Sequence, residues 1–347
     1  MMIRSSCWRQ FAWLLLWAPL VNAATQDTPI EAVLMGQALQ AIAQRQEADG
    51  SWTATSMGPP QPVAYNDPER IRVTSGALLA FLVCGYLPDV DSCYRSIVDR
   101  GMNALLQGMD AHGCWSHNAI DQAWATEAID ACDIEDEAAR YRKAANLATS
   151  CLIAETNALR NAGPRELHPI IMAYATAGNE LDVNTSESSQ DLLEASQVWW
   201  NTHHIGGDSP AVSRVLERSA SAASGTSEDV SAELAGNLAH LGKGHGDDML
   251  DLLCAHLATP GQMDNKRSLG SLSAAIQGMY MDSGGSTWTS WTQWLMRTLV
   301  ARRRPDGLWD PDQPGPTSLP GRVGATALVV LILERIYIGN AIRKDGR

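Results

Sequence analysis

A glycine followed two residues later by a tryptophan occurs three times in this chain, each time directly after a predicted helix. The three copies are Asp49-Gly50-Ser51-Trp52, His112-Gly113-Cys114-Trp115 and Asp306-Gly307-Leu308-Trp309. Glycine can end a helix in the left-handed conformation, and the indole that follows can then cover the exposed helix end. Recurrence of this turn at equivalent places indicates a chain built from helical repeats.

Apolar residues recur at helical spacing along most of the chain, and no segment alternates convincingly as a strand would. The predicted helices span residues 30–47, 74–86, 92–108, 119–132, 137–160, 166–177, 189–201, 226–241, 246–258, 269–281, 287–303 and 323–339. Odd-numbered helices of this series tend to carry charges on one face, whereas the even-numbered ones are shorter and richer in small and apolar residues. We therefore predict an all-α ring of six helical hairpins, with the even-numbered helices on the inside.

The first copy of the repeated turn, Gln46-x3-Gly50-x-Trp52, resembles the QW repeat of squalene cyclases, and Met109 and Arg303 replace the glutamine in the other two copies. Protein prenyltransferase β-subunits and complement thioester domains are related to that family. The likeness extends over most of residues 30–340, and it implies an (α/α)6 toroid in a small exported bacterial protein, with residues 24–347 as a single domain. The Gln46 amide is expected to reach carbonyls that its own helix leaves unpaired.

The catalytic devices of these families are missing from this sequence. Squalene-hopene-type cyclases protonate their substrate with an Asp-x-Asp-Asp cluster. The nearest match here, Asp133-Ile134-Glu135-Asp136, has glutamate in the third place and follows the end of an inner helix. The zinc ligands of the prenyltransferases and the Cys-Gly-Glu-Gln thioester motif are absent. The sequence therefore predicts neither a metal site nor a cofactor.

Residues 1–23 have the features of a secretory signal, because Arg4 and Arg9 precede an apolar run from Phe11 to Leu20 and Ala23 follows as a small residue. We expect an exported protein, periplasmic or extracellular, with no integral membrane span after cleavage. The formal charge is −13, from 26 basic and 39 acidic residues, and loss of the two signal arginines makes it 24 minus 39, or −15. Since the chain is acidic, a general nucleic-acid binder is excluded.

Six cysteines remain once the signal and its Cys7 are removed, and export would permit disulfides between them. Cys84 and Cys93 bracket a short turn. They could form a disulfide across its base, or both could be buried thiols, and the spacing favours neither alternative.

One face of the predicted ring is a candidate binding surface, because the long connections lead from outer to inner helices and would all lie on that face. A basic or imidazole residue stands before or at the start of each inner helix, where helix N-termini also attract anions. We expect this face to bind an anionic small molecule, a glycan or a partner protein. The candidate binding residues are Arg70, Arg72, His117, Asp121, Trp124, His168, Asp208 and Arg322.

Two classes of function remain open. The favoured hypothesis is a non-catalytic binding or scaffold module, because most tryptophans lie in the signal, at helix ends or on outer helices. The alternative is an enzyme of the toroid class, either a terpenoid cyclase-like protein or a polysaccharide lyase or hydrolase. The polysaccharide enzyme would use His117, Asp121, His168 or Asp208 as acid and base.

A cyclase would need aromatic faces around its cavity to stabilise carbocations. The predicted inner helices supply few aromatic residues, namely Phe81, Trp124, Tyr174, Tyr280 and Tyr337. This scarcity favours a function other than carbocation chemistry.

Overall fold

The computed structural model describes most of the chain, and the parts described consist of helices joined by turns and loops. The described residues are 28–54, 67–88, 90–116, 118–132, 139–156, 168–173, 227–240, 248–259, 267–282, 286–312 and 317–344. The predicted signal at 1–23 and the predicted helix at 189–201 lie outside them. Within these ranges the only strand-like pairing is an isolated bridge between Arg303 and Trp309.

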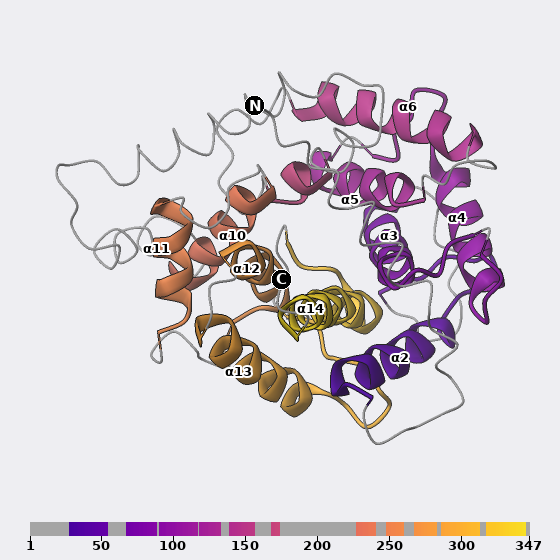
Figure 1. The fold of residues 1–347 in the computed structure, drawn as a ribbon. Coiled ribbons are helices and arrows are strands. Elements are labelled where there is room, and N and C mark those ends of the chain that lie inside the picture. The colour runs from indigo at the N-terminus through magenta and orange to yellow at the C-terminus, as the bar shows by residue number, and fades with distance from the viewer. Residues whose placement is uncertain are drawn as a thin grey trace.

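The helices form two concentric layers (Figure 1). The outer layer contains α2 (Ile30–Ala43), α4 (Arg95–Gly108), α6 (Ala139–Thr156), α11 (Asp248–Leu257) and α13 (Ser286–Arg302). The inner layer contains α3 (Pro68–Val83), α5 (Ala119–Asp130), α10 (Ser227–His240), α12 (Leu269–Asp282) and α14 (Gly321–Lys344). Residues 168–173 are also helical and pack against α5 and α6. This alternation of outer and inner helices is the toroid that the sequence predicts.

Burial explains which helices lie inside. In α3 almost every residue from Arg70 to Leu82 is buried, whereas α4 buries only a stripe that includes Val98, Met102 and Leu105. A helix that is apolar on most sides must be surrounded by others, and a helix with one apolar stripe can face water. The even-numbered helices of the predicted series therefore take the inner positions.

The ring closes where the two ends of the described chain meet. The last inner helix, α14, packs against α12, against α3 and against the first outer helix, α2. In the turn after α13, Asp306 forms ion pairs with Arg45, which follows α2, and with Arg322 of α14, at 3.3 and 2.7 Å. Packing and charge therefore both join the first hairpin to the last.

The three glycine–tryptophan turns cap the outer helices as predicted. Gly50, Gly113 and Gly307 have φ angles of 91, 87 and 83°, a region that favours glycine. In each copy the indole N–H donates to a carbonyl near the end of the preceding outer helix. The bonds run from Trp52 to Ile42 at 2.9 Å, from Trp115 to Leu105 at 2.6 Å and from Trp309 to Leu299 at 2.7 Å.

The Gln46 amide does not bind the end of its own helix, which corrects the sequence-based expectation. Its Nε2 donates to the carbonyl of Gly50 and to that of Ile97, both at 2.8 Å. Because Ile97 lies in the first turn of α4, the glutamine joins its own turn to the next outer helix. Helix α2 ends at Ala43, so Gln46 already lies beyond its helix and faces the neighbouring repeat.

Helix α3 begins at Pro68, earlier than the predicted residue 74. Asp67 is its N-cap and accepts a hydrogen bond from the Glu69 N–H at 3.1 Å, and Pro68 occupies the first helical position. An N-cap aspartate followed by proline is a recognised helix start. The earlier start places Arg70 and Arg72 on the helix rather than in the preceding loop.

Helix α14 is long and apolar enough to cross a membrane by length and composition, over residues 321–343. In the fold, 67% of its most apolar window is buried among the other helices. Core helices of soluble proteins pass the same test, and α14 contacts α2, α3 and α12 as a core helix does.

The structure contains a disulfide between Cys114 and Cys151, which no spacing argument had suggested. The possible Cys84–Cys93 disulfide is not formed, and both residues are free thiols. Cys84 is only partly buried and Cys93 is exposed, so the picture of two buried thiols is also wrong for Cys93.

Candidate functional site

The starts of the inner helices α3 and α5 bring Arg72 and Asp121 together. Nε of Arg72 lies 2.6 Å from Oδ1 of Asp121, whose side chain is completely buried, whereas Arg72 is 21% exposed. The Ser116 hydroxyl, just before α5, donates to Oδ2 of Asp121 at 3.2 Å. The Arg72 guanidinium is therefore in close contact with one oxygen of this carboxyl, and the Ser116 hydroxyl with the other.

Burial raises the pKa of Asp121 above the ordinary value for aspartate. Arg72 and the Ser116 hydroxyl act in the opposite direction, and the charge of Asp67 adds to the increase. The charge of Asp67 therefore acts on Asp121. A buried carboxyl with a raised pKa beside a partly exposed one is an arrangement typical of acid–base chemistry.

The other two candidate arginines are also paired with carboxylates. Arg70 is buried, forms an ion pair with Asp49, and donates from Nε to the Ser51 hydroxyl at 2.9 Å. Arg322 contacts Asp306 at 2.7 Å and Asp310 at 3.2 Å. The three arginines thus balance nearby carboxylates, and two of them hold the glycine–tryptophan turns against the inner helices.

His168 lies elsewhere in the ring, against α10. Its Nδ1 is 2.8 Å from Oδ1 of Asn237, and its ring centroid is 5.7 Å from that of His240. Burial lowers the pKa of His168 to about 4, although the Asn237 hydrogen bond raises it slightly. Burial also lowers the pKa of His240, with smaller contributions from His168 and Arg335. Both imidazoles are therefore neutral near pH 7.

Trp124 lies on α5, one turn after Asp121, and is buried. Among the residues that the structure describes, its indole N–H meets no hydrogen-bond acceptor, which is unusual for a buried tryptophan. His117 and Asp208, as well as the Asp133–Asp136 segment, lie outside the described residues, so the structure says nothing of them.

Two carboxylates of the inner layer were missed by the sequence reasoning. Asp67 was overlooked because helix α3 was predicted to start after it, although the Asp67-Pro68 pair is a start signal. Glu233 is completely buried on α10, and its Oε1 accepts hydrogen bonds from Thr317 at 3.1 Å and Ser271 at 3.5 Å. No local pattern marks Glu233, because its partners come from distant parts of the chain.

Aromatic side chains of the inner helices serve mainly to join the two layers. Phe81 packs against Trp52 and Tyr94, with ring centroids 6.3 and 5.0 Å apart. Tyr280 packs against Trp288 of the outer helix α13 at 6.2 Å. Among the residues described, the inner layer is otherwise rich in buried polar groups, and no cluster of three or more potential metal ligands occurs.

Comparison with solved structures places this arrangement among known toroids. The apo type II terpene cyclase MstE from Scytonema is similar over 89% of this chain and 99% of its own, with 12% identity and a TM-score of 0.53. An inactive variant of the α-1,6-mannanase GH76A of Salegentibacter sp. HEL1_6, in complex with α-1,6-mannotetrose, covers the same shares with 10% identity and a TM-score of 0.55.

No protein-family model matches the sequence, and no curated protein is detectably similar to it. The chain therefore has an (α/α)6 toroid fold, which it shares with enzymes of two different chemistries. At these identities the likeness shows the fold alone.

Proposed function

We propose that this protein is an enzyme of the toroid class that cleaves a polysaccharide at the face where the inner helices begin. The observation that carries the proposal is Asp121, a completely buried carboxyl whose pKa is raised by burial, beside Arg72 and Ser116. A carboxyl whose pKa is raised keeps its proton to a higher pH than one in water, which is what a general acid toward a leaving group needs. Asp67, partly exposed at the N-cap of α3, supplies the second carboxylate that glycoside cleavage requires.

A polar substrate fits the inner layer better than an isoprenoid does. Phe81 and Tyr280 pack toward the outer layer, whereas buried Asp121, Glu233 and Asn237 belong to the inner helices. Carbocation chemistry depends on aromatic faces around the reacting carbon, and hydroxyl-rich substrates depend on polar partners. The similar mannanase also loses activity in a variant with two aspartates replaced by alanine.

The non-catalytic binding or scaffold module favoured by the sequence gains no support from the comparisons, because both similar proteins are enzymes. It stays the main competing hypothesis, since the three candidate arginines are all paired with carboxylates. The two hypotheses differ in whether a bound glycan is turned over.

The Cys114–Cys151 disulfide supports the proposal that the protein is exported, to the periplasm or beyond. Disulfides persist in oxidising compartments and are rare in the cytosol. A fusion of residues 1–23 to a reporter that is active only outside the cytoplasm tests the proposed signal.

The catalytic proposal is tested by incubating the purified protein with a panel of glycans that includes α-1,6-mannan, and by measuring new reducing ends. Asp121→Asn should lower turnover by about 100-fold or more, because asparagine cannot donate the proton. Asp99→Asn, on the exposed side of α4, is the matched control and should retain activity. A wild-type protein that binds a glycan without cleaving any would favour the binding module, and conversion of a polyprenyl substrate instead would favour a cyclase.

A further inference from the structure

Each glycine–tryptophan turn is fastened to the next outer helix, but the three copies use different groups. In the first copy, Gln46 joins the Gly50 carbonyl to Ile97 of α4. A Cβ on Gly50 would lie 2.3 Å from the Arg100 carbonyl oxygen, which shows how closely the turn approaches α4. The third copy lies against α2, where ion pairs of Asp306 make the connection.

The second copy has Met109 where the first has Gln46, and a thioether cannot donate a hydrogen bond. Gln122 of the inner helix α5 takes over this role. Its Nε2 donates to the Gly113 carbonyl at 2.9 Å and to the Ala148 carbonyl of α6 at 3.0 Å. Its Oε1 accepts from the Trp115 backbone N–H at 3.0 Å. In the second copy alone, the turn is fastened by the residue next to Asp121.

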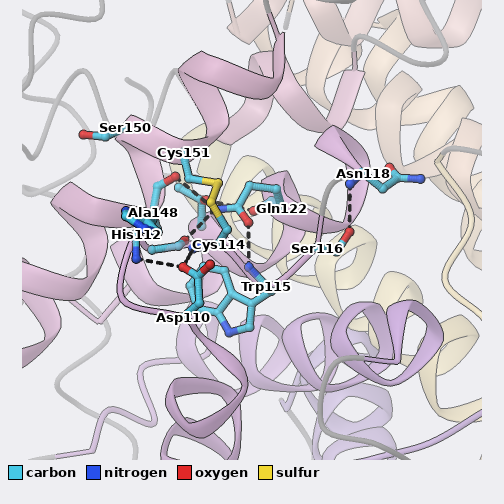
Figure 2. The surroundings of a disulfide bond; sticks show 12 residues. Asp110, His112, Cys114, Trp115, Ser116, Asn118, Gln122, Ala148, Ser150 and Cys151 are labelled. Atoms are coloured by element: carbon cyan, nitrogen blue, oxygen red, sulfur yellow. Dashed lines mark hydrogen bonds between the residues drawn. A yellow bond between two sulfur atoms is a disulfide. The ribbon is translucent and has the colours of Figure 1, made fainter.

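The disulfide joins this same turn to the same outer helix (Figure 2). Cys114 lies between Gly113 and Trp115, and Cys151 lies on α6, one turn after Ala148. Ser116, whose hydroxyl donates to Asp121, follows two residues after Cys114. The covalent bond and the Gln122 amide therefore act on one short segment, residues 113–116, whose last residue, Ser116, contacts Asp121.

We propose that the Cys114–Cys151 disulfide is a redox-controlled clamp on the candidate acid site, and that reducing it lets residues 113–116 move away from Asp121. The proposal rests on the assignment of Asp121 as the acid. The disulfide and Gln122 are positioning groups, because they act on Asp121 through Ser116 and the neighbouring backbone. The first and third turns contain no cysteine and so cannot form such a bond.

The chemistry of opening is thiol–disulfide exchange with a dithiol. A thiolate of the dithiol attacks one sulfur of the protein disulfide, which breaks the S–S bond, releases one cysteine as a thiol and forms a mixed disulfide with the other. The second thiol of the dithiol then attacks the dithiol's own sulfur in the mixed disulfide. This step releases the second cysteine as a thiol and leaves the dithiol as a cyclic disulfide, so that both Cys114 and Cys151 end as thiols. Two electrons and two protons pass to the protein. Cys114 is partly exposed in the folded protein, so the reductant can approach it.

The test follows proton binding by Asp121 and needs no substrate. Protein labelled with carbon-13 at the aspartate carboxyls is titrated from pH 8 to the onset of acid unfolding, before and after treatment with dithiothreitol. The Asp121 signal is the one lost in Asp121→Asn. On reduction, the Asp121 pKa should fall toward the ordinary value of about 3.9, because burial is the main cause of its increase and water gains access. The Cys114→Ser/Cys151→Ser double variant should titrate like the reduced protein, with or without dithiothreitol.

Gln46→Met is the matched control, because it removes the fastening of the first turn and makes that turn resemble the second. It should lower the melting temperature without changing the Asp121 titration. The same Asp121 titration in the oxidised and reduced proteins would overturn the proposal, and so would global unfolding on reduction, because the bond would then hold the fold rather than the site. Since no glycan is present, either result is independent of whether the protein cleaves polysaccharides.

Discussion

The buried side chains of the inner layer have protonation equilibria and hydrogen-bonding needs that differ from those of the same residues in water. Asp121, His168 and Trp124 are the sharpest cases. The sequence named all three as candidate binding residues. It did not reveal that Asp121 contacts Arg72, or that the Trp124 indole N–H finds no acceptor in the described part of the chain, because both facts depend on which helices are neighbours.

His168 should make the fold sensitive to acid. Its pKa is about 4 in the folded protein and about 6.5 in the unfolded chain, so the unfolded chain binds the proton more readily between these values. The contribution of neutral His168 to the free energy of unfolding should be complete above pH 6.5. As the pH drops to 4, this contribution should fall by about 3 kcal/mol. Urea unfolding across this pH range measures the loss.

His168→Gln should reduce that pH dependence, since glutamine can still donate to Asn237 but does not take up a proton, while His240, whose pKa burial also lowers, keeps its own share. His112→Gln, in an exposed turn, is the control and should leave the curve unchanged. A wild-type stability that stays constant from pH 6.5 to pH 4 would contradict the neutral, buried state of His168.

Trp124 and Trp309 allow the value of an indole hydrogen bond to be measured in one protein. Both are buried, but Trp309 donates to Leu299, whereas Trp124 donates to no group within the described ranges of the chain. Replacement by phenylalanine removes a similar volume at each position. Trp309→Phe should therefore destabilise the protein by about 1–3 kcal/mol more than Trp124→Phe. Equal losses in chemical denaturation would mean that the Trp309 hydrogen bond contributes nothing.

At the scale of the element, helix starts and stops decide where side chains lie. The predicted helices were largely recovered by the structure, because apolar periodicity is a local property of the sequence. The start of α3 was missed because residues 53–73 are rich in proline and were predicted to be a long connection, yet the Asp67 cap and Pro68 begin the helix there. That shift is what brings Arg72 to Asp121.

The contribution of a glycine–tryptophan turn to stability can be measured by replacing its glycine with alanine. Gly50→Ala combines an unfavourable positive φ with a Cβ 2.3 Å from the Arg100 carbonyl oxygen, so it should cost about 2 kcal/mol or more. Gly36→Ala is the matched control, because Gly36 lies inside α2 and a Cβ there meets nothing within 4 Å. It should be neutral or stabilise the protein by up to about 1 kcal/mol. Thermal melts compare the two, and similar losses for both would refute the role of the turn.

At the scale of the whole molecule, the ring is closed by contacts between its first and last helices. Helix α14 contacts α2, α3 and α12. Asp306, in the last outer turn, forms ion pairs with Arg45 of the first hairpin and with Arg322 at the start of α14. Closure of this kind should couple the hairpins, so that the described helices unfold together.

Removal of residues 321–347 should abolish the single cooperative thermal transition and expose the amides of α2 to hydrogen exchange. The physical reason is that α14 supplies the buried surface against which α2 and α3 pack. A truncated protein that still melts in one transition near the wild-type temperature would show that the other hairpins close without it.

The sequence alone determined the helical repeat, the alternation of inner and outer helices and the covering of helix ends by Trp52, Trp115 and Trp309. These features depend on local spacing and on the conformation that glycine allows. Only the tertiary structure decided that Cys114 pairs with Cys151, that Gln122 replaces the missing glutamine of the second turn, and that Asp121 loses its contact with water. Each of these depends on which distant segments the ring brings within a few ångströms, and the spacing of residues along the chain does not contain that information.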